Sequence, residues 1–229
     1  MKRTIAALVL ITAAASGQTQ VVARKPLVRA FGEASITSVP DQAKISFAVE
    51  TRAATAQEAA SQNATISSAV ITALQGVIGT NGDVQTAGYS LTAIYTYPPN
   101  GGQGTLSGFL ASNTLQATLN NLAVVGRLID SGIQAGANRV QSLTFLLKDP
   151  EPVRLQALKL AATKAKGHAD AMASGAGMRA GAVLSIVEGA DSTPVVYRDA
   201  AVAGASAATP VVPGGVITTA TVTIEYELN

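Results

Sequence analysis

Hydrophobic and polar positions alternate along separate parts of the chain, and this period of two predicts β-strands. The clearest case is residues 43–49, where Ala43, Ile45, Phe47 and Val49 alternate with mostly polar neighbours. Looser alternation predicts strands over residues 28–38, 84–97, 109–119, 140–147, 182–188 and 219–227. Each of these segments suits a strand with one buried face.

Three stretches between the strands predict helices. Thr55 and Glu58 have the spacing of a capping box, and helical periodicity follows until Gly79. The apolar face of this first helix is expected to contain Ala59, Ile66, Val70, Ala73 and Val77. Asn120 or Asn121 can cap a second helix that ends around residues 132–136.

The third helix begins near Pro150 and Pro152, because proline in a first turn loses no intrahelical hydrogen bond. Steps of three and four predict one buried face, made of Leu155, Leu158, Ala162, Ala165, Ala169, Met172 and Ala176. Core packing explains this face better than a coiled coil, since its small side chains suit close approach to a sheet.

The order of elements predicts an α+β fold with a mainly antiparallel sheet covered by helices. Residues 43–147 read β-α-β-β-α-β, a split βαβ unit, which the third helix and the C-terminal strands extend. We expect a single domain over residues 28–229. Residues 199–215 are rich in Ala, Gly, Pro and Val and are expected to form a mobile loop.

The first 17 residues have the pattern of a cleavable secretion signal. Lys2 and Arg3 precede an apolar run over residues 5–15, and small residues follow up to Gly17. The alternative, a membrane anchor, needs about 20 apolar residues, and the run is shorter. We therefore expect export, a short tether over residues 18–27, and no transmembrane segment in the mature chain.

Composition narrows the possible partners and compartment. Hydrophobic residues make up 48% of the chain but aromatic residues only 4%, so the core must be aliphatic. Without Lys2 and Arg3 the basic and acidic residues balance, and no basic cluster follows Arg24 and Lys25, which argues against nucleic acid as a partner. The chain has no cysteine, which excludes disulfides and mildly favours a bacterial periplasm.

Candidate catalytic groups are few. His168 is the single histidine and lies on the third helix, and no Gly-x-Ser-x-Gly motif accompanies it, so an exposed helical residue is the simpler interpretation. The nearest carboxylate groups are Asp149 with Glu151, Glu188 with Asp191, and Glu225 with Glu227. Helix-dipole and edge-strand roles account for these groups, and we expect no catalytic residue, metal or cofactor.

Three tyrosines form the candidate interaction surface. Tyr89, Tyr95 and Tyr97 lie in one expected strand, next to the Pro- and Gly-rich loop at residues 98–104. That loop joins two strands and lacks Gly-x-Gly-x-x-Gly, so it does not favour phosphate binding. Ordinary strand packing and a subunit or ligand contact both remain open for the tyrosines.

Several short motifs follow one another at residues 31–34, 39–43, 86–91, 136–145, 157–173 and 177–188. Their order and spacing resemble the SIMPL-domain family, which includes periplasmic and outer-membrane immunogenic proteins of Gram-negative bacteria. The resemblance covers residues 28–228. It implies an envelope-associated protein without established catalytic residues, whose relatives can form large ring-like or channel-like homo-oligomers.

The sequence thus favours a non-enzymatic, exported protein of the cell envelope that self-assembles as a scaffold, a channel-like body or a stress-protective protein. Two alternatives stay open. One is a periplasmic hydrolase that uses carboxylates or serine with His168. The other is a peripheral membrane or ligand-binding module that uses the tyrosine-rich strand and the loop at 98–104.

Overall fold

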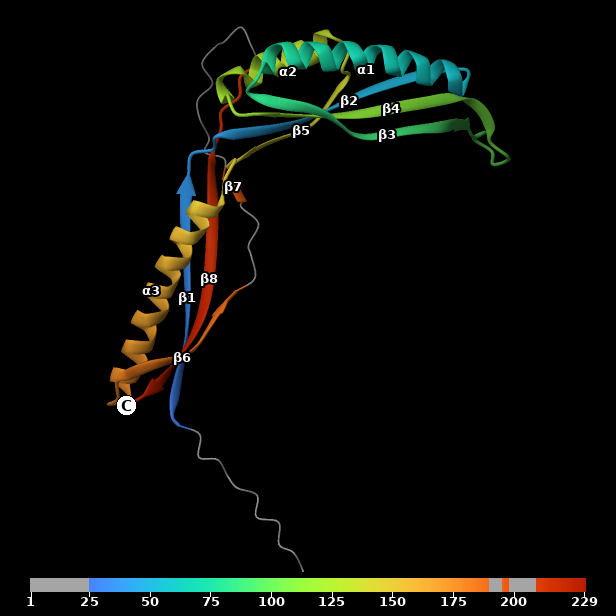
Figure 1. Ribbon diagram of the computed structural model, residues 1–229. Coiled ribbons are helices and arrows are strands. Elements are labelled where there is room, and N and C mark those ends of the chain that lie inside the picture. The colour runs from blue at the N-terminus through green and yellow to red at the C-terminus, as the bar shows by residue number, and fades with distance from the viewer. Residues whose placement is uncertain (1–24, 190–194, 198–208) are drawn as a thin grey trace, which may run out of the picture.

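The chain folds into two antiparallel sheets that meet at an angle (Figure 1). The computed structural model describes residues 25–189, 195–197 and 209–229. The expected leader at 1–17, most of the tether and residues 199–208 of the expected loop lie outside the described residues. Within the described parts, every pair of neighbouring strands runs antiparallel.

The first sheet has the strand order β3-β4-β2-β5. Its strands are β2 (Gln42–Ala53), β3 (Gly82–Thr96), β4 (Thr105–Leu119) and β5 (Arg139–Leu146). One face is covered by α1 (Ala56–Ile78) and α2 (Val125–Gln134), and the short turn η1 (Leu122–Val124) precedes α2 (Figure 1). The chain order of these elements is β-α-β-β-α-β, and the predicted α+β class is confirmed.

The second sheet has the order β1-β8-β6, and β7 pairs with the start of β8. Its elements are β1 (Leu27–Ser38), α3 (Glu151–Gly175), β6 (Ala180–Glu188), β7 (Val195–Tyr197) and β8 (Gly215–Leu228). The register of β1 on β8 runs without interruption from Leu27↔Glu227 to Ser38↔Val216. The third helix and the C-terminal strands therefore extend the first unit as a separate sheet, which the N-terminal strand joins.

The core of the first sheet follows the predicted alternation on β2. Ala43, Ile45, Phe47 and Val49 are all fully buried. They pack against aliphatic residues of the two helices and of β4, among them Val70, Leu74, Leu128, Leu115 and Leu119.

The buried face of α1 differs from the predicted one because it contains polar residues. Asn63 and Ser67 are buried at its centre, whereas Ile66 lies only partly buried beside them. The Asn63 side-chain amide donates to the Val49 carbonyl oxygen at 2.7 Å and to that of Ala111 at 3.2 Å. The helix is thus hydrogen-bonded to two neighbouring strands, an interaction that hydrophobic periodicity alone does not predict.

The prediction for the buried face of α3 was partly wrong. The buried residues are alanines at every fourth position, namely Ala157, Ala161, Ala165, Ala169 and Ala173. Leu155 and Met172, expected inside, are each 47% exposed. The reason is the short distance between helix and sheet: a Cβ atom at Gly32 of β1 would lie 2.0 Å from the Ala161 carbonyl oxygen. Only methyl groups and a glycine fit this contact.

Gly32→Ala is expected to lower the free energy of unfolding by about 1–3 kcal/mol, because the added methyl group meets helix backbone that cannot move away alone. Urea denaturation followed by circular dichroism measures this change. The matched control is Gly167→Ala on α3, where no atom lies within 4 Å of the added Cβ and alanine favours the helix. Equal stability of the Gly32 variant and the wild type would contradict the close contact.

Asn63→Ala is expected to cost about 1–3 kcal/mol, because the carbonyl groups of Val49 and Ala111 lose a buried donor. The same denaturation experiment measures the loss. Gln62→Ala serves as the control, since the neighbouring side chain is exposed and donates only to Glu58. Its effect should stay within about 0.5 kcal/mol.

Candidate functional site

The three tyrosines of the candidate interaction surface lie on a long hairpin made by β3 and β4. Tyr89 and Tyr95 belong to β3, and Tyr97 follows its last residue. All three side chains are more than half exposed. Strand packing therefore does not bury them.

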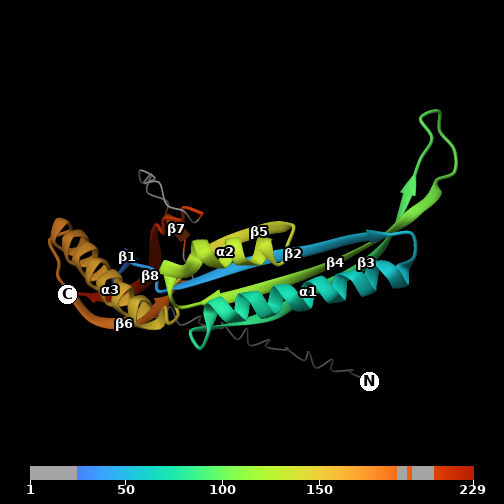
Figure 2. The same cartoon turned by 90° about the horizontal axis from the view of Figure 1, so that it is seen from above.

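The end of this hairpin projects beyond the rest of the first sheet. The neighbouring strand β2 ends at Ala53, which pairs with Phe109 of β4. Further out, β3 and β4 pair only with each other, and the projection past the end of α1 is visible in Figure 2. We call residues 94–108 the hairpin tip.

Three large side chains share one face of the hairpin tip. Tyr95 lies opposite Leu106 in the strand register. The ring of Tyr97 lies over Gly104, where a Cβ atom would come within 2.7 Å of it. The exposed fractions are 52% for Tyr95, 69% for Tyr97 and 53% for Leu106. The tip thus presents an exposed aromatic and aliphatic face.

The hairpin tip also lacks formal charge. Between Asp83 and Arg127 the sequence contains no Asp, Glu, Lys, Arg or His. This long uncharged run could have been found in the sequence. Its position at the projecting end of a sheet could not.

The outer strand β6 carries a second exposed apolar surface. Val183, Leu184, Ile186 and Val187 are each between 50% and 63% exposed, and we call them the β6 edge. Among the described strands β6 pairs only with β8, and no charged residue occurs from Ala180 to Val187. The sequence predicted this strand but not the exposure of its side chains. The feature that could have indicated it is the apolar run at residues 182–187, which does not alternate with polar residues.

The opposite outer strand, β1, is protected by the single histidine. The Leu228 amide donates to the Pro26 carbonyl oxygen. In an antiparallel pair every second residue bonds to the neighbouring strand, so the even-numbered residues of β1 bond to β8. The backbone groups of Phe31 therefore point away from β8. His168 is exposed, as predicted, and its Nδ1 lies 2.7 Å from that Phe31 oxygen. A carbonyl oxygen can only accept, so His168 donates from Nδ1 and occupies an edge acceptor.

The candidate carboxylates are engaged in separate ion pairs. Glu225 accepts from Arg29 Nε at 2.7 Å, and Glu227 accepts from Lys25 Nζ at 2.7 Å. Glu151 bonds to Arg154 at 2.8 Å, and this hydrogen bond lowers the pKa of the Glu151 carboxyl group. A lowered pKa is the opposite of what a general acid requires.

Two of the other candidate carboxylates, Glu188 and Asp149, also have hydrogen-bond partners. Arg154 bonds to Glu188 as well as to Glu151, and Asp149 accepts from the Glu151 amide at 3.2 Å. Asp191 lies outside the described residues. The structure therefore gathers Glu151 and Glu188 around the Arg154 guanidinium, where both carboxylates are ion-paired, and it brings neither of them to His168. Within the described residues no three metal-ligating side chains cluster.

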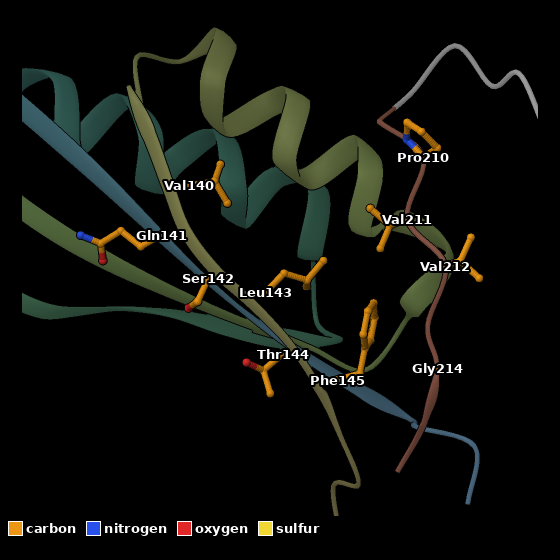
Figure 3. Close-up of a pocket in the computed structure, with 10 residues that line it drawn as sticks. All are labelled: Val140, Gln141, Ser142, Leu143, Thr144, Phe145, Pro210, Val211, Val212 and Gly214. Atoms are coloured by element: carbon orange, nitrogen blue, oxygen red, sulfur yellow. The ribbon is translucent and has the colours of Figure 1, made fainter. Parts of the chain in front are cut away.

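A cleft of about 760 Å³ lies between β5 and residues 210–214 (Figure 3). Leu143, Phe145 and Val211 belong to the core of the first sheet or pack against it, while Ser142 and Thr144 point away from them. The residues that line the cleft include no ionisable side chain; they are Val140, Gln141, Ser142, Leu143, Thr144, Phe145, Pro210, Val211, Val212 and Gly214. The cleft offers no acid, base or charged ligand group.

One end of the expected loop at 199–215 is held in place beside this cleft. The Thr209 hydroxyl donates to Asp130 of α2 at 2.6 Å, and the Thr209 amide donates to the same carboxylate at 3.2 Å. Val211 packs against the core, and Gly215 begins β8. The described part of that loop is therefore anchored to α2 and to the sheet core.

None of the helices in the described ranges combines the length and the apolar character that crossing a bilayer would require.

Comparison with known proteins places this fold in a family. Residues 28–226 match the SIMPL family, described as "Protein of unknown function (DUF541)". The chain is 29% identical over 174 residues to the 26 kDa periplasmic immunogenic protein of Brucella melitensis, covering 75% of this chain and 70% of the relative. It is 30% identical over 194 residues to the uncharacterized protein YggE of Edwardsiella ictaluri, covering 81% and 79%.

A further relative is the uncharacterized protein YggE of Escherichia coli K12, which is 28% identical over 161 residues and is covered to 65% of its length. None of these names describes an enzyme, and the Brucella relative is named as periplasmic. The family match spans both sheets and all three α-helices. The chain belongs to the SIMPL family.

Proposed function

We propose that this chain is a non-enzymatic protein of the Gram-negative cell envelope that is exported to the periplasm and assembles there into a homo-oligomer. The observation that carries the proposal is the β6 edge, which exposes four large aliphatic side chains on an outer strand that pairs on one side only, with β8, and has no charged residue from Ala180 to Val187. Export is supported by the leader pattern at residues 1–17 and by the periplasmic relative. In this proposal residues 28–229 act as one domain.

An open strand edge of this kind favours pairing with another chain. Natural proteins protect outer strands with charges, prolines or covering elements, because unpaired N–H and C=O groups bind other strands. In the second sheet β1 has such protection: it carries Arg29 and Glu33, and His168 occupies the Phe31 carbonyl oxygen. From Ala180 to Val187 the β6 strand has no charged residue and no proline; its single charge is Glu188 at its end, and its pairing with β8 is irregular near Val183. The contrast supports β6 as the strand that contacts a second copy.

The non-enzymatic part of the proposal is supported by where the candidate groups lie. Glu225 and Glu227 bond to Arg29 and Lys25 on β1 and its approach. His168 donates to the backbone. The cleft along β5 contains no ionisable group. A hydrolase needs a nucleophile or carboxylate pair that converges with a base, and these residues are held apart on different surfaces.

Ile186→Lys is expected to lower the oligomeric mass of the exported chain, because an ammonium group on this exposed strand must stay hydrated and opposes pairing. Size-exclusion chromatography with light scattering measures the mass. Leu160→Lys on the outside of α3 is the matched control, since this leucine is 46% exposed but lies on a helix. It should leave the mass unchanged. A wild-type monomer at every concentration would contradict the assembly.

His168→Ala is expected to have the opposite effect, because it frees the outward carbonyl group of Phe31 on β1. The variant should associate further than the wild type, with a modest loss of about 0.5–1.5 kcal/mol in the free energy of unfolding. Light scattering and urea denaturation measure the two effects. His168→Gln, which keeps a side-chain donor, should come closer to the wild type in both. If His168→Ala changed neither the oligomeric mass nor the free energy of unfolding, His168 would not protect the outer edge of β1.

A further inference from the structure

The hairpin tip combines exposure, apolar side chains and absence of charge at a place far from the β6 edge. Tyr95, Tyr97 and Leu106 lie on one face of the hairpin tip, where β3 and β4 have no strand neighbour other than each other. In Figure 2 the tip is the outermost part of the described fold at that end. A contact made here would reach a large, flat surface before any other part of the molecule on that side.

We infer that the hairpin tip inserts its tyrosine face into the interfacial region of a lipid bilayer. Tyrosine is enriched at this depth, because its ring is apolar and its hydroxyl group remains at the hydrated headgroups. The inference is independent of the proposed assembly, which uses β6. It concerns a surface contact and not a membrane-spanning segment.

Part of the tip's backbone is already hydrogen-bonded within the hairpin. β3 and β4 pair with each other as far as Thr96 and Thr105, so the inward-facing amide and carbonyl groups of alternate residues bond across the hairpin, and the outward-facing groups can keep the water of the headgroup region. The Ser107 hydroxyl donates to the Ile94 carbonyl oxygen at 3.1 Å. The Thr105 hydroxyl donates to the Thr96 carbonyl oxygen at 3.4 Å. Polar groups with internal partners are far less costly to dehydrate than free ones.

The absence of charge distinguishes a lipid surface from other partners. The uncharged run from Val84 to Gly126 contains no group that would have to be desolvated as an ion, and none that could pair with a charged protein surface. It also contains no lysine or arginine to recognise anionic lipids. Binding should therefore depend on apolar and aromatic burial alone.

Vesicle co-sedimentation tests this inference with the chain that lacks residues 1–17. We expect the protein to sediment with phosphatidylcholine vesicles. The bound fraction should not change when part of the lipid is replaced by phosphatidylglycerol, or in roughly 1 M sodium chloride, where the Debye length is about 3 Å. The double variant Tyr95→Asp with Tyr97→Asp should fall to the level found without vesicles.

Tyr89→Asp is the matched control, because Tyr89 is about as exposed as Tyr95 on the same strand but lies opposite Asn113, where β4 also pairs with β2. It should bind as the wild type does. Circular dichroism and light scattering of each variant separate a binding defect from misfolding or a changed assembly.

Four results would overturn the inference. The first is equal vesicle binding by the wild type and the double variant, and the second is no binding by the wild type. The third is binding that requires phosphatidylglycerol and disappears in high salt, since that would assign it to a charged surface. A double variant that loses oligomeric mass while Ile186→Lys keeps it would also overturn it, because the tip would then be a subunit contact.

Discussion

Both sheets are covered by helices on one face only, and this one-sided packing depends on close contact between small side chains. On the second sheet, alanines at every fourth position of α3 meet Gly32 and the buried face of β8 at a distance that admits no larger group. On the first sheet, Asn63 adds hydrogen bonds between α1 and two strands. A core with so few aromatic residues gains its stability from this close approach.

The same arrangement leaves outer strands that differ in how well they are protected from pairing with another chain. This difference suggests separate roles for β1, β6 and the end of the β3–β4 hairpin. β1 is covered by α3 and bonded by His168. β6 is apolar and has no charge from Ala180 to Val187, and the far end of the β3–β4 hairpin is uncharged and carries two exposed tyrosines. The first open surface suits strand pairing with another copy, because it offers backbone groups beside aliphatic side chains. The second suits a lipid interface, because its tyrosines combine an apolar ring with a hydroxyl group that can stay at the hydrated headgroups.

The charged residues support this interpretation because they stabilise the fold and do not gather at a site. Arg29 and Lys25 bond to glutamates at the C-terminal end of β8, which joins the first and last strands across almost the whole length of the chain. Exposed ion pairs of this kind contribute little stability each. These ion pairs lie between β8 and the β1 side of the second sheet, away from both the β6 edge and the hairpin tip.

The sequence by itself determined the α+β class, the order of the elements apart from the short strand β7, the cap at Thr55 and the family, because these depend on local periodicity and on short motifs. It did not determine that β1 pairs with β8, that Asn63 is buried, or that α3 packs through alanines while Leu155 faces outward. These features depend on distances between segments that are remote in the chain. Only the tertiary structure decided which of many apolar residues lack a partner, since burial is a property of neighbours and not of the residue itself.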